Sequence, residues 1–251
     1  MSLLAPLVFI AFLVEAAAGF GSMVIALTVG ALIFKVDELL LWLVPVNLVL
    51  SLWLVFRGRA HVDWPFLVRR LLPLMGAGLA VGLFIADAAS SATWLKPVFG
   101  AFVVAVSVWQ LRTALRPSSE AALPFAARAA ALLGAGVIHG IYATGGPLAV
   151  FVSARELPDK ATFRATLSML WVVMNVFVVG RFAWDGALTA ATLTTSAWML
   201  LPLAGGIVVG DWLHHRLDER RFRVTVAVLL MIAGAVLTLN SLPGGETSHP
   251  R

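Results

Sequence analysis

The sequence predicts an all-α polytopic membrane protein with two inverted repeats, each a re-entrant helical hairpin followed by three transmembrane helices, eight helical elements in all. Three observations predict this fold. Charged residues make up 12% of the 251 residues, whereas soluble globular domains carry about 25%. Six apolar segments are long enough to span a membrane. Two further apolar stretches are interrupted by glycines at matching places in the two halves.

The elements follow in the same order in each half. A spanning helix needs about 20 apolar residues to cross about 30 Å of hydrocarbon. The first repeat, 1–116, is predicted to hold a hairpin at 3–34 and spans at 38–56, 66–86 and 94–114. A cytoplasmic linker at 117–128 precedes the second repeat. That repeat, 129–242, is predicted to hold a hairpin at 129–154 and spans at 162–181, 189–210 and 222–242, before a polar tail at 243–251.

The first glycine-interrupted stretch, 3–34, is too long for one ordinary span and too short for two. As a single helix it would measure about 48 Å, and split at Gly19–Gly21 its arms would measure about 24 and 20 Å. The second stretch has the same kind of break, where Gly145, Gly146 and Pro147 follow one another. Length therefore favours a re-entrant hairpin at both places.

The basic residues lie in short segments between the apolar runs. Fourteen of the 18 Lys and Arg residues fall in segments 57–70, 112–128, 155–164 and 216–223. Because basic residues concentrate on the cytoplasmic side of membrane proteins, we place all four segments there. Each interrupted stretch must then leave the membrane on the side where it entered. Stretch 3–34 enters from the periplasm and stretch 129–154 from the cytoplasm, and both termini are periplasmic. The first twenty residues lack a basic n-region, so no cleaved signal peptide is expected.

The two halves are similar in sequence. "LPLMGAGLAVG" in the first half resembles "LPLAGGIVVG" in the second. Asn47 and Asn175 fall inside corresponding spans, and Arg57 and Arg181 end them. Three crossings per half is an odd number, so the second copy is inverted. Inverted repeats with broken helices are common in secondary transporters. Gene duplication in a structural membrane protein is the alternative.

The two hairpin tips are predicted to form an anion site. At each tip a helix begins inside the membrane, where its free N–H groups and its dipole favour an anion. Glycine lets a bound group approach the backbone, and proline suits a first helical turn. The alternative is that the glycines only permit close helix packing. The candidate substrate-binding residues are Gly19, Phe20, Gly21, Ser22, Asn47, Tyr142, Thr144, Gly145, Gly146, Pro147 and Asn175.

Glu15 and His139 each lie six residues before a tip glycine, Gly21 and Gly145. An ionisable residue inside a membrane is a functional candidate by default. A carboxylate repels an anion, so Glu15 is expected to be protonated, to pair with His139, or to couple transport to protons. We assign both residues to proton coupling. The alternative is that each only hydrogen-bonds its own hairpin, just as Asn47 and Asn175 either donate to the substrate or hold helices together.

Longer stretches carry a family resemblance. The first half contains "GFGSMVIALTVGALIF", "GRAHVDWPFLVRRLLPLMGAGLAVGLFIA" and "LKPVFGAFVVAVSVWQLR", and the second contains "GIYATGGPLAVFVSAR" and "LPLAGGIVVGDWLHHRLDERRFRVTVAVLLMIAGAVL". In this order and spacing they resemble the TauE/SafE sulfite-exporter family of anion permeases. The resemblance implies a bacterial inner-membrane transporter of sulfite, organosulfonates or related carboxylates. The chain departs from the family pattern at the first tip, where "GFGS" replaces a longer glycine run followed by proline.

Neither a cofactor nor a metal is expected. The chain has no cysteine, which excludes disulfides, iron–sulfur clusters and thiolate ligands. Asp211, His214 and His215 are not expected to bind a metal. Adjacent histidines on a helix point in different directions, and no third ligand lies at a useful spacing. No GxxxxGK[ST] motif is present, so ATP is not expected to drive transport. The basic loops orient the protein in a bilayer, so no nucleic-acid partner is expected.

The sequence therefore predicts a secondary transporter, an exporter or permease of a small anion, and not an enzyme. Its expected partners are that anion and the lipid bilayer, with a homodimer left open. Two other classes of protein stay open as alternatives. One is an intramembrane enzyme that uses Glu15, His139 and Ser22 on a small or lipid substrate. The other is a non-transporting membrane assembly subunit.

Overall fold

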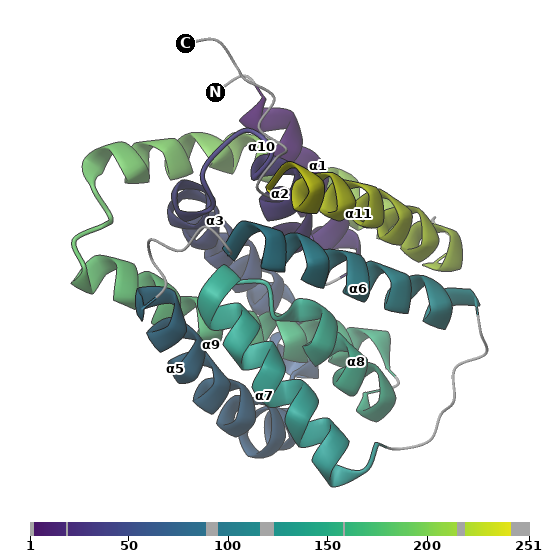
Figure 1. The fold of residues 1–251 in the computed structure, drawn as a ribbon. Helices are drawn as coiled ribbons and strands as arrows, with labels where there is room; N and C mark the ends of the chain where they lie inside the picture. The colour runs from purple at the N-terminus through teal and green to yellow at the C-terminus, as the bar shows by residue number, and fades with distance from the viewer. Residues whose placement is uncertain are drawn as a thin grey trace.

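The structure, a computed structural model, describes residues 3–18, 20–88, 95–115, 123–157, 159–214 and 219–241. Every regular element in these residues is a helix (Figure 1). The elements are α1 (Leu4–Ala18), α2 (Ser22–Gly30), α3 (Val36–Gly58), η1 (Arg59–His61), α4 (Trp64–Phe66), η2 (Leu67–Leu71), α5 (Leu72–Ala88), α6 (Leu95–Leu115), α7 (Phe125–Tyr142), α8 (Gly146–Glu156), α9 (Lys160–Trp184), α10 (Ala190–His214) and α11 (Glu219–Ser241). The predicted tip residue Gly19 lies outside the described residues.

The predicted spans are confirmed as helices. Helical stretches long and apolar enough to cross a membrane are Val36–His61, Trp64–Ala88, Phe125–Tyr142, Lys160–Trp184 and Ala190–Trp212. Four of these contain predicted spans. The fifth contains the first arm of the second predicted hairpin. The two remaining predicted spans are α6 and α11, helices of 21 and 23 residues that pack along each other.

The second glycine-interrupted stretch begins earlier than the sequence predicted. The helix α7 starts at Phe125, directly after Pro124, and so includes residues 125–128 of the predicted linker. A proline next to the first helical turn starts a helix well, because the N–H that it lacks has no partner there. With 18 and 11 residues, α7 and α8 are about 27 and 16 Å long. The two arms are therefore unequal.

Each interrupted stretch returns to the end of the molecule where it began. Arg128, near the start of α7, bonds Glu156 at the end of α8 with an N–O distance of 2.9 Å. In the first stretch, Leu7 near the start of α1 lies beside Gly30 at the end of α2, where a Cβ on the glycine would be 3.4 Å from Leu7 Cδ2. The two helices of each stretch fold back on one another at the break.

Each interrupted stretch also packs against a long helix from the other half of the chain. The helix α7 lies along α5, and α1 lies along α10 (Figure 1). Glycines bring the backbones close: a Cβ on Gly82 of α5 would lie 2.2 Å from Val137 O, and one on Gly210 of α10 would lie 2.7 Å from Leu13 O. Small residues allow such close helix packing in membranes. The remaining long helices pair as α3 with α9 and α6 with α11.

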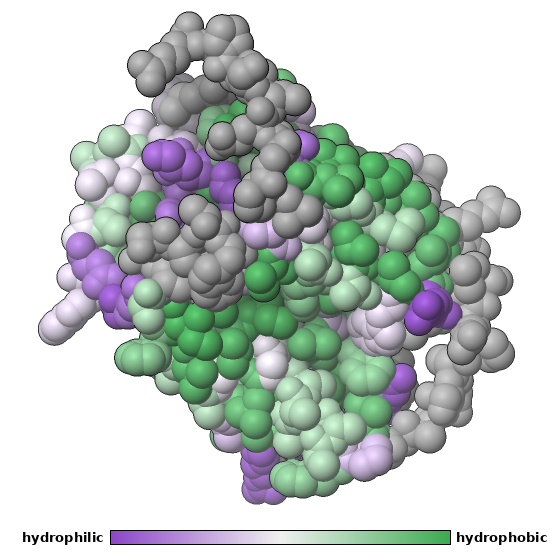
Figure 2. Space-filling model, viewed as in Figure 1, coloured by the Kyte–Doolittle hydropathy of each residue, from purple (hydrophilic) through white to green (hydrophobic). Residues whose placement is uncertain are grey.

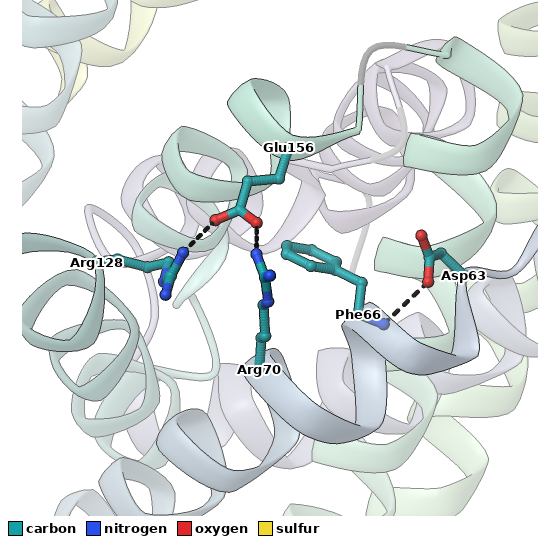
Figure 3. Close-up of polar contacts among 5 residues, drawn as sticks. All are labelled: Asp63, Phe66, Arg70, Arg128 and Glu156. Carbon is teal, nitrogen blue, oxygen red and sulfur yellow. Dashed lines mark hydrogen bonds and ion pairs between the residues drawn. The ribbon is translucent and has the colours of Figure 1, made fainter. Parts of the chain in front are cut away.

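Two arginines hold Glu156 at the end of α8 (Figure 3). Arg128 of α7 and Arg70, just before α5, each bond one of its carboxylate oxygens. The Glu156 and Arg128 side chains are only 17% and 20% exposed, so solvent screens this contact less than it screens an open surface pair. The cluster fixes the end of α8 that lies away from the tip.

Two further ion pairs lie at opposite ends of the long helices. Arg57, near the end of α3, lies 3.6 Å from Asp211 of α10. Arg181, near the end of α9, lies 3.0 Å from Asp87 of α5. Arg164, near the start of α9, also bonds Asp211 at 2.8 Å, so the two pairs are a helix length apart. In each pair, the arginine of one half meets an aspartate of the other half.

Apolar side chains cover much of the surface between these charged ends. Figure 2 shows a broad apolar area with hydrophilic residues gathered at its edges. Large side chains such as Phe84, Val208 and Phe177 are 74%, 70% and 61% exposed. Soluble monomers rarely expose large contiguous apolar patches. Contact with lipid explains this surface.

Candidate functional site

A cavity lies where the two helix breaks meet α3 and α9. The cavity volume open to the centre of a water molecule is about 20 Å³, and one water needs about 10–15 Å³ by this measure. In this conformation the cavity therefore holds only a few atoms. Its wall consists of Glu15, Phe20, Gly21, Met23, Val24, Asn47, His139, Ala143, Thr144, Gly146 and Trp171.

Glu15 occupies the N-terminus of α2. Its Oε2 accepts a hydrogen bond from the Ser22 backbone N–H at 3.1 Å and a short one from the Ser22 hydroxyl. The amide of Asn47, from α3, donates to Oε1 at 3.0 Å and to Oε2 at 3.1 Å. Each of these partners donates to the carboxylate. The N-terminus of α2 is therefore already capped by a carboxyl group of the protein itself.

The backbone at the first break requires glycine. Gly21 has φ +108° and precedes the first residue of α2. This left-handed conformation is open to glycine and strained for residues with a Cβ. A Cβ on Gly21 would meet only Val14 Cγ1, at 3.9 Å. The glycine at this position serves the turn rather than close helix packing.

The second break leaves its polar groups unused. His139 and Thr144 are each 2% exposed and line the cavity. Within the described residues, neither ring nitrogen of His139 has a hydrogen-bond partner, and neither does the hydroxyl group of Thr144. Buried polar groups normally find partners. These two side chains, next to the N-terminus of α8, are therefore available to a ligand.

The adjacent tip glycines differ in their surroundings. A Cβ on Gly145 would lie 2.2 Å from Ala135 O in α7, so this glycine is required for the contact between α7 and α8. A Cβ on Gly146 would meet only Trp171 Cζ2, at 3.8 Å, and Gly146 lines the cavity. Pro147 follows in the first turn of α8, as its fixed φ predicts. Of Gly145 and Gly146, Gly146 is the one whose backbone lines the cavity.

Asn47 and Asn175 meet where α3 packs against α9. The Asn175 side-chain amide donates to Asn47 Oδ1 at 2.7 Å, across 128 residues of sequence. Both side chains are buried. Asn47 also donates to Glu15. The side-chain nitrogens of both asparagines therefore donate hydrogen bonds within the protein. No ion pair joins Glu15 to His139 in the part of the chain that the structure describes.

The structure thus divides the predicted site residues into two groups. Cavity-lining residues from the prediction are Glu15, Phe20, Gly21, Asn47, His139, Thr144 and Gly146. Predicted residues that lie near the cavity without lining it are Ser22, Tyr142, Gly145, Pro147 and Asn175. The Tyr142 ring packs on Phe99 instead, with 4.7 Å between ring centroids.

Trp171 and Ala143 are wall residues that sequence reasoning missed. The Trp171 ring stacks on His139, with centroids 5.8 Å apart and planes 13° apart. Its position four residues before Asn175 places it on the same helix face, which was a usable signal. Ala143 ends α7 with φ 51° and donates to His139 O at 2.7 Å. A left-handed alanine is uncommon and marks strain at functional places, but its residue type carries no such signal.

The comparisons with known proteins find membrane transporters. The chain is 29% identical over 172 residues to the probable inner membrane transporter protein TsaS of Comamonas testosteroni, which covers 67% of this chain and 70% of that protein. No solved structure matches the chain. The family model described as sulfite exporter TauE/SafE matches residues 4–237, almost the whole chain. These matches are to transporters rather than to enzymes, and the chain belongs to the sulfite exporter TauE/SafE family of membrane transporters.

Proposed function

We propose that this protein is a secondary transporter of a small anion, such as sulfite, an organosulfonate or a small carboxylate. The anion binds at the second tip, between His139, Thr144 and the backbone at Gly146. One observation carries the proposal: these buried polar groups line the cavity and have no partners among the described residues. They lie at the N-terminus of an 11-residue helix, whose dipole favours an anion. The family description, which names sulfite, supports this class of substrate.

The two tips have different roles in this proposal. At the first tip, the Glu15 carboxylate takes the hydrogen bonds that a substrate anion would need. At the second tip, the polar side chains have no partners among the described residues. Glu15 and His139 are the titratable residues among those lining the cavity. A protonated Glu15 no longer repels the anion, so proton and anion bind together. We assign proton coupling to this pair.

The size of the cavity favours the smallest members of the substrate class. Its volume of about 20 Å³ for the centre of a water molecule corresponds to about one or two waters. A sulfite ion, with one sulfur and three oxygens, needs only a modest widening. An organosulfonate with a longer carbon chain needs the tips to move apart.

The membrane arrangement belongs to the same proposal. Two inverted repeats, each with a re-entrant pair of helices, explain why α1 pairs with α10 as α7 pairs with α5. They also explain why Arg57 bonds Asp211 at one end while Arg181 bonds Asp87 at the other. The basic ends of the helices are cytoplasmic. The protein lies in the bacterial inner membrane with both termini in the periplasm.

Single cysteines test this topology, because the chain has none of its own. Ala161 at the start of α9 and Ala190 at the start of α10 are both exposed. In intact cells, Ala190→Cys should react with an impermeant maleimide added outside. Ala161→Cys should react only after the membrane is opened. Labelling of Ala161→Cys from outside would rule out the proposed orientation and with it the re-entrant path of α7 and α8.

Purified protein tests the function directly. Sulfite, a short organosulfonate, a small carboxylate and a neutral amino acid are added in turn, and the melting temperature is measured. Binding at about 100 times Kd stabilises the folded state by about 2.7 kcal/mol, so a true substrate raises the melting temperature clearly. The same anion should then cross vesicle membranes that contain the protein. Turnover in detergent without any gradient would favour an enzyme, and a fixed co-purifying partner with no transport would favour an assembly subunit.

A further inference from the structure

We propose that Asn47 and Asn175 form a hydrogen-bond relay through which the protonation of Glu15 decides whether His139 offers the cavity an N–H or a lone pair. The inference rests on the proposed function and deepens it, because it supplies the physical link between binding a proton and binding an anion. An anion accepts hydrogen bonds and is repelled by a lone pair. The relay therefore makes the second tip receptive only when Glu15 is protonated.

The first two links are closed in the structure, and their direction follows from chemistry. A carboxylate can only accept hydrogen bonds, so Asn47 must turn its Nδ2 toward Glu15, where the distances are 3.0 and 3.1 Å. Its Oδ1 then faces α9 and accepts from Asn175 Nδ2 at 2.7 Å. The charge on Glu15 thereby fixes the orientation of both amides. Asn175 is left with its Oδ1 directed away from Asn47.

The last link joins Asn175 to His139 and is open in this conformation. The side chains of His139 and Asn175 lie close enough to interact. Neither ring nitrogen of His139 has a hydrogen-bond partner among the described residues, and neither has the buried Asn175 Oδ1. An amide oxygen attracts an N–H. A neutral imidazole that donates one N–H to Asn175 has only a lone pair on its other nitrogen. That nitrogen repels an anion in the cavity.

Protonation of Glu15 reverses the sequence of donors. The carboxyl now has an O–H to donate, and Asn47 accepts it by turning its Oδ1 toward Glu15. Its Nδ2 then donates to Asn175 Oδ1, and the Asn175 amide donates to His139. The amides only rotate, and the proton stays on Glu15. Water protonates the ring nitrogen that faces the cavity, and the proton on the nitrogen that faces Asn175 returns to water, so the charge of the ring is unchanged and its N–H faces the anion.

Few other titratable groups face the relay. Against α1 at this level, α10 presents Gly206 and Gly210, and against α7, α5 presents Gly82. From α2 and α3, Glu15 meets Ser22 and Asn47. Tyr142 lies one helical turn from His139, is buried, and packs on Phe99. The aspartates of α5 and α10 are at the helix ends, where arginines bond them.

The imidazole nitrogens of His139 report the relay. Protein labelled with ¹⁵N-histidine is titrated in detergent without added anion, and the His139 signal is identified by its loss in His139→Asn. The wild type should change the tautomer of His139 over the pH range in which sulfite affinity changes. Asn175→Leu should hold one tautomer throughout. The ratio of sulfite affinity at low pH to that at high pH, on the order of 10-fold or more for a coupling of this kind, should shrink in this variant.

Thr28→Val is the matched control, because Thr28 is a buried polar residue of α2 bonded within its own helix. It should keep the wild-type tautomer change. Should Asn175→Leu fail to fold, the His139 titration is measured in Asn175→Ser and in the wild type instead. A wild-type His139 tautomer that stays fixed across this range overturns the relay, as does an unchanged affinity ratio in Asn175→Leu. If sulfite and the other anions bind at no pH, the proposed function fails instead, and the tautomer titration still tests the relay.

Discussion

Glu15→Gln is expected to transport the anion at a rate that no longer depends on pH. In the wild type, transport should fall as the pH rises, because Glu15 loses its proton and the carboxylate repels the substrate. Glutamine has the shape of the protonated carboxyl but does not titrate. It also fits the hydrogen bonds at this place, since the Ser22 hydroxyl and the Asn47 amide can each donate or accept.

The measurement is anion uptake into vesicles at a series of pH values, with binding measured in parallel by thermal shift. Glu38→Gln serves as the control, because Glu38 is an exposed acid in the first turn of α3. It should keep the wild-type profile. Glu15→Ala should instead lower stability, by about 1–3 kcal/mol for each donor left buried without a partner. A Glu15→Gln protein with the wild-type pH profile would leave Glu15 as a structural cap of α2.

Gly146→Leu is expected to abolish both anion binding and transport while the protein still inserts and folds. The Cβ at this position has room, 3.8 Å from Trp171 Cζ2, so the backbone need not move. The rest of the leucine side chain must enter a cavity that holds only about one or two waters. It would also cover the N-terminus of α8. Gly146→Ala should give a weaker loss of the same kind.

Substitutions at two other glycines separate loss of the site from loss of the fold. Gly180→Leu is the control for insertion and size, since a Cβ there meets nothing within 4 Å and the residue is exposed. It should behave like the wild type. Gly145→Ala should lower stability instead, because its Cβ would lie 2.2 Å from Ala135 O. Normal thermal stabilisation of Gly146→Leu by sulfite would show that the anion binds elsewhere.

The positions of the helices and of the two breaks could be predicted from the sequence alone. Both depend on local properties. A long apolar run is a helix in a membrane because its backbone groups have no other partners there, and each predicted span ends within four residues of an observed helical stretch. Gly21 breaks the first stretch through its left-handed backbone, and Pro147 sets the start of α8 through its fixed φ. The start of α7 at Phe125 was missed because Arg128 was counted with the loop, whereas its side chain reaches Glu156.

Several candidates at matching places in the two halves lie near one another in the structure. Glu15 and His139 occupy matching places before the two breaks, and the structure brings both to the same cavity. The inverted repeat that we propose would explain this without any tertiary information, because equivalent residues of two such halves meet near a pseudo-twofold axis. Asn47 and Asn175 meet for the same reason.

Only the tertiary structure decided how these residues are used. The sequence treats the two tips as equivalent, yet the carboxylate of Glu15 fills the first and the polar groups of the second remain free. Likewise, Gly145 packs on α7 while Gly146 faces the cavity. These differences depend on how far each helix is rotated about its axis. In a helix that is apolar on every side, hydropathy does not determine this rotation. Contacts between residues far apart in the sequence determine it, such as the one between Asn47 and Asn175, 128 positions apart.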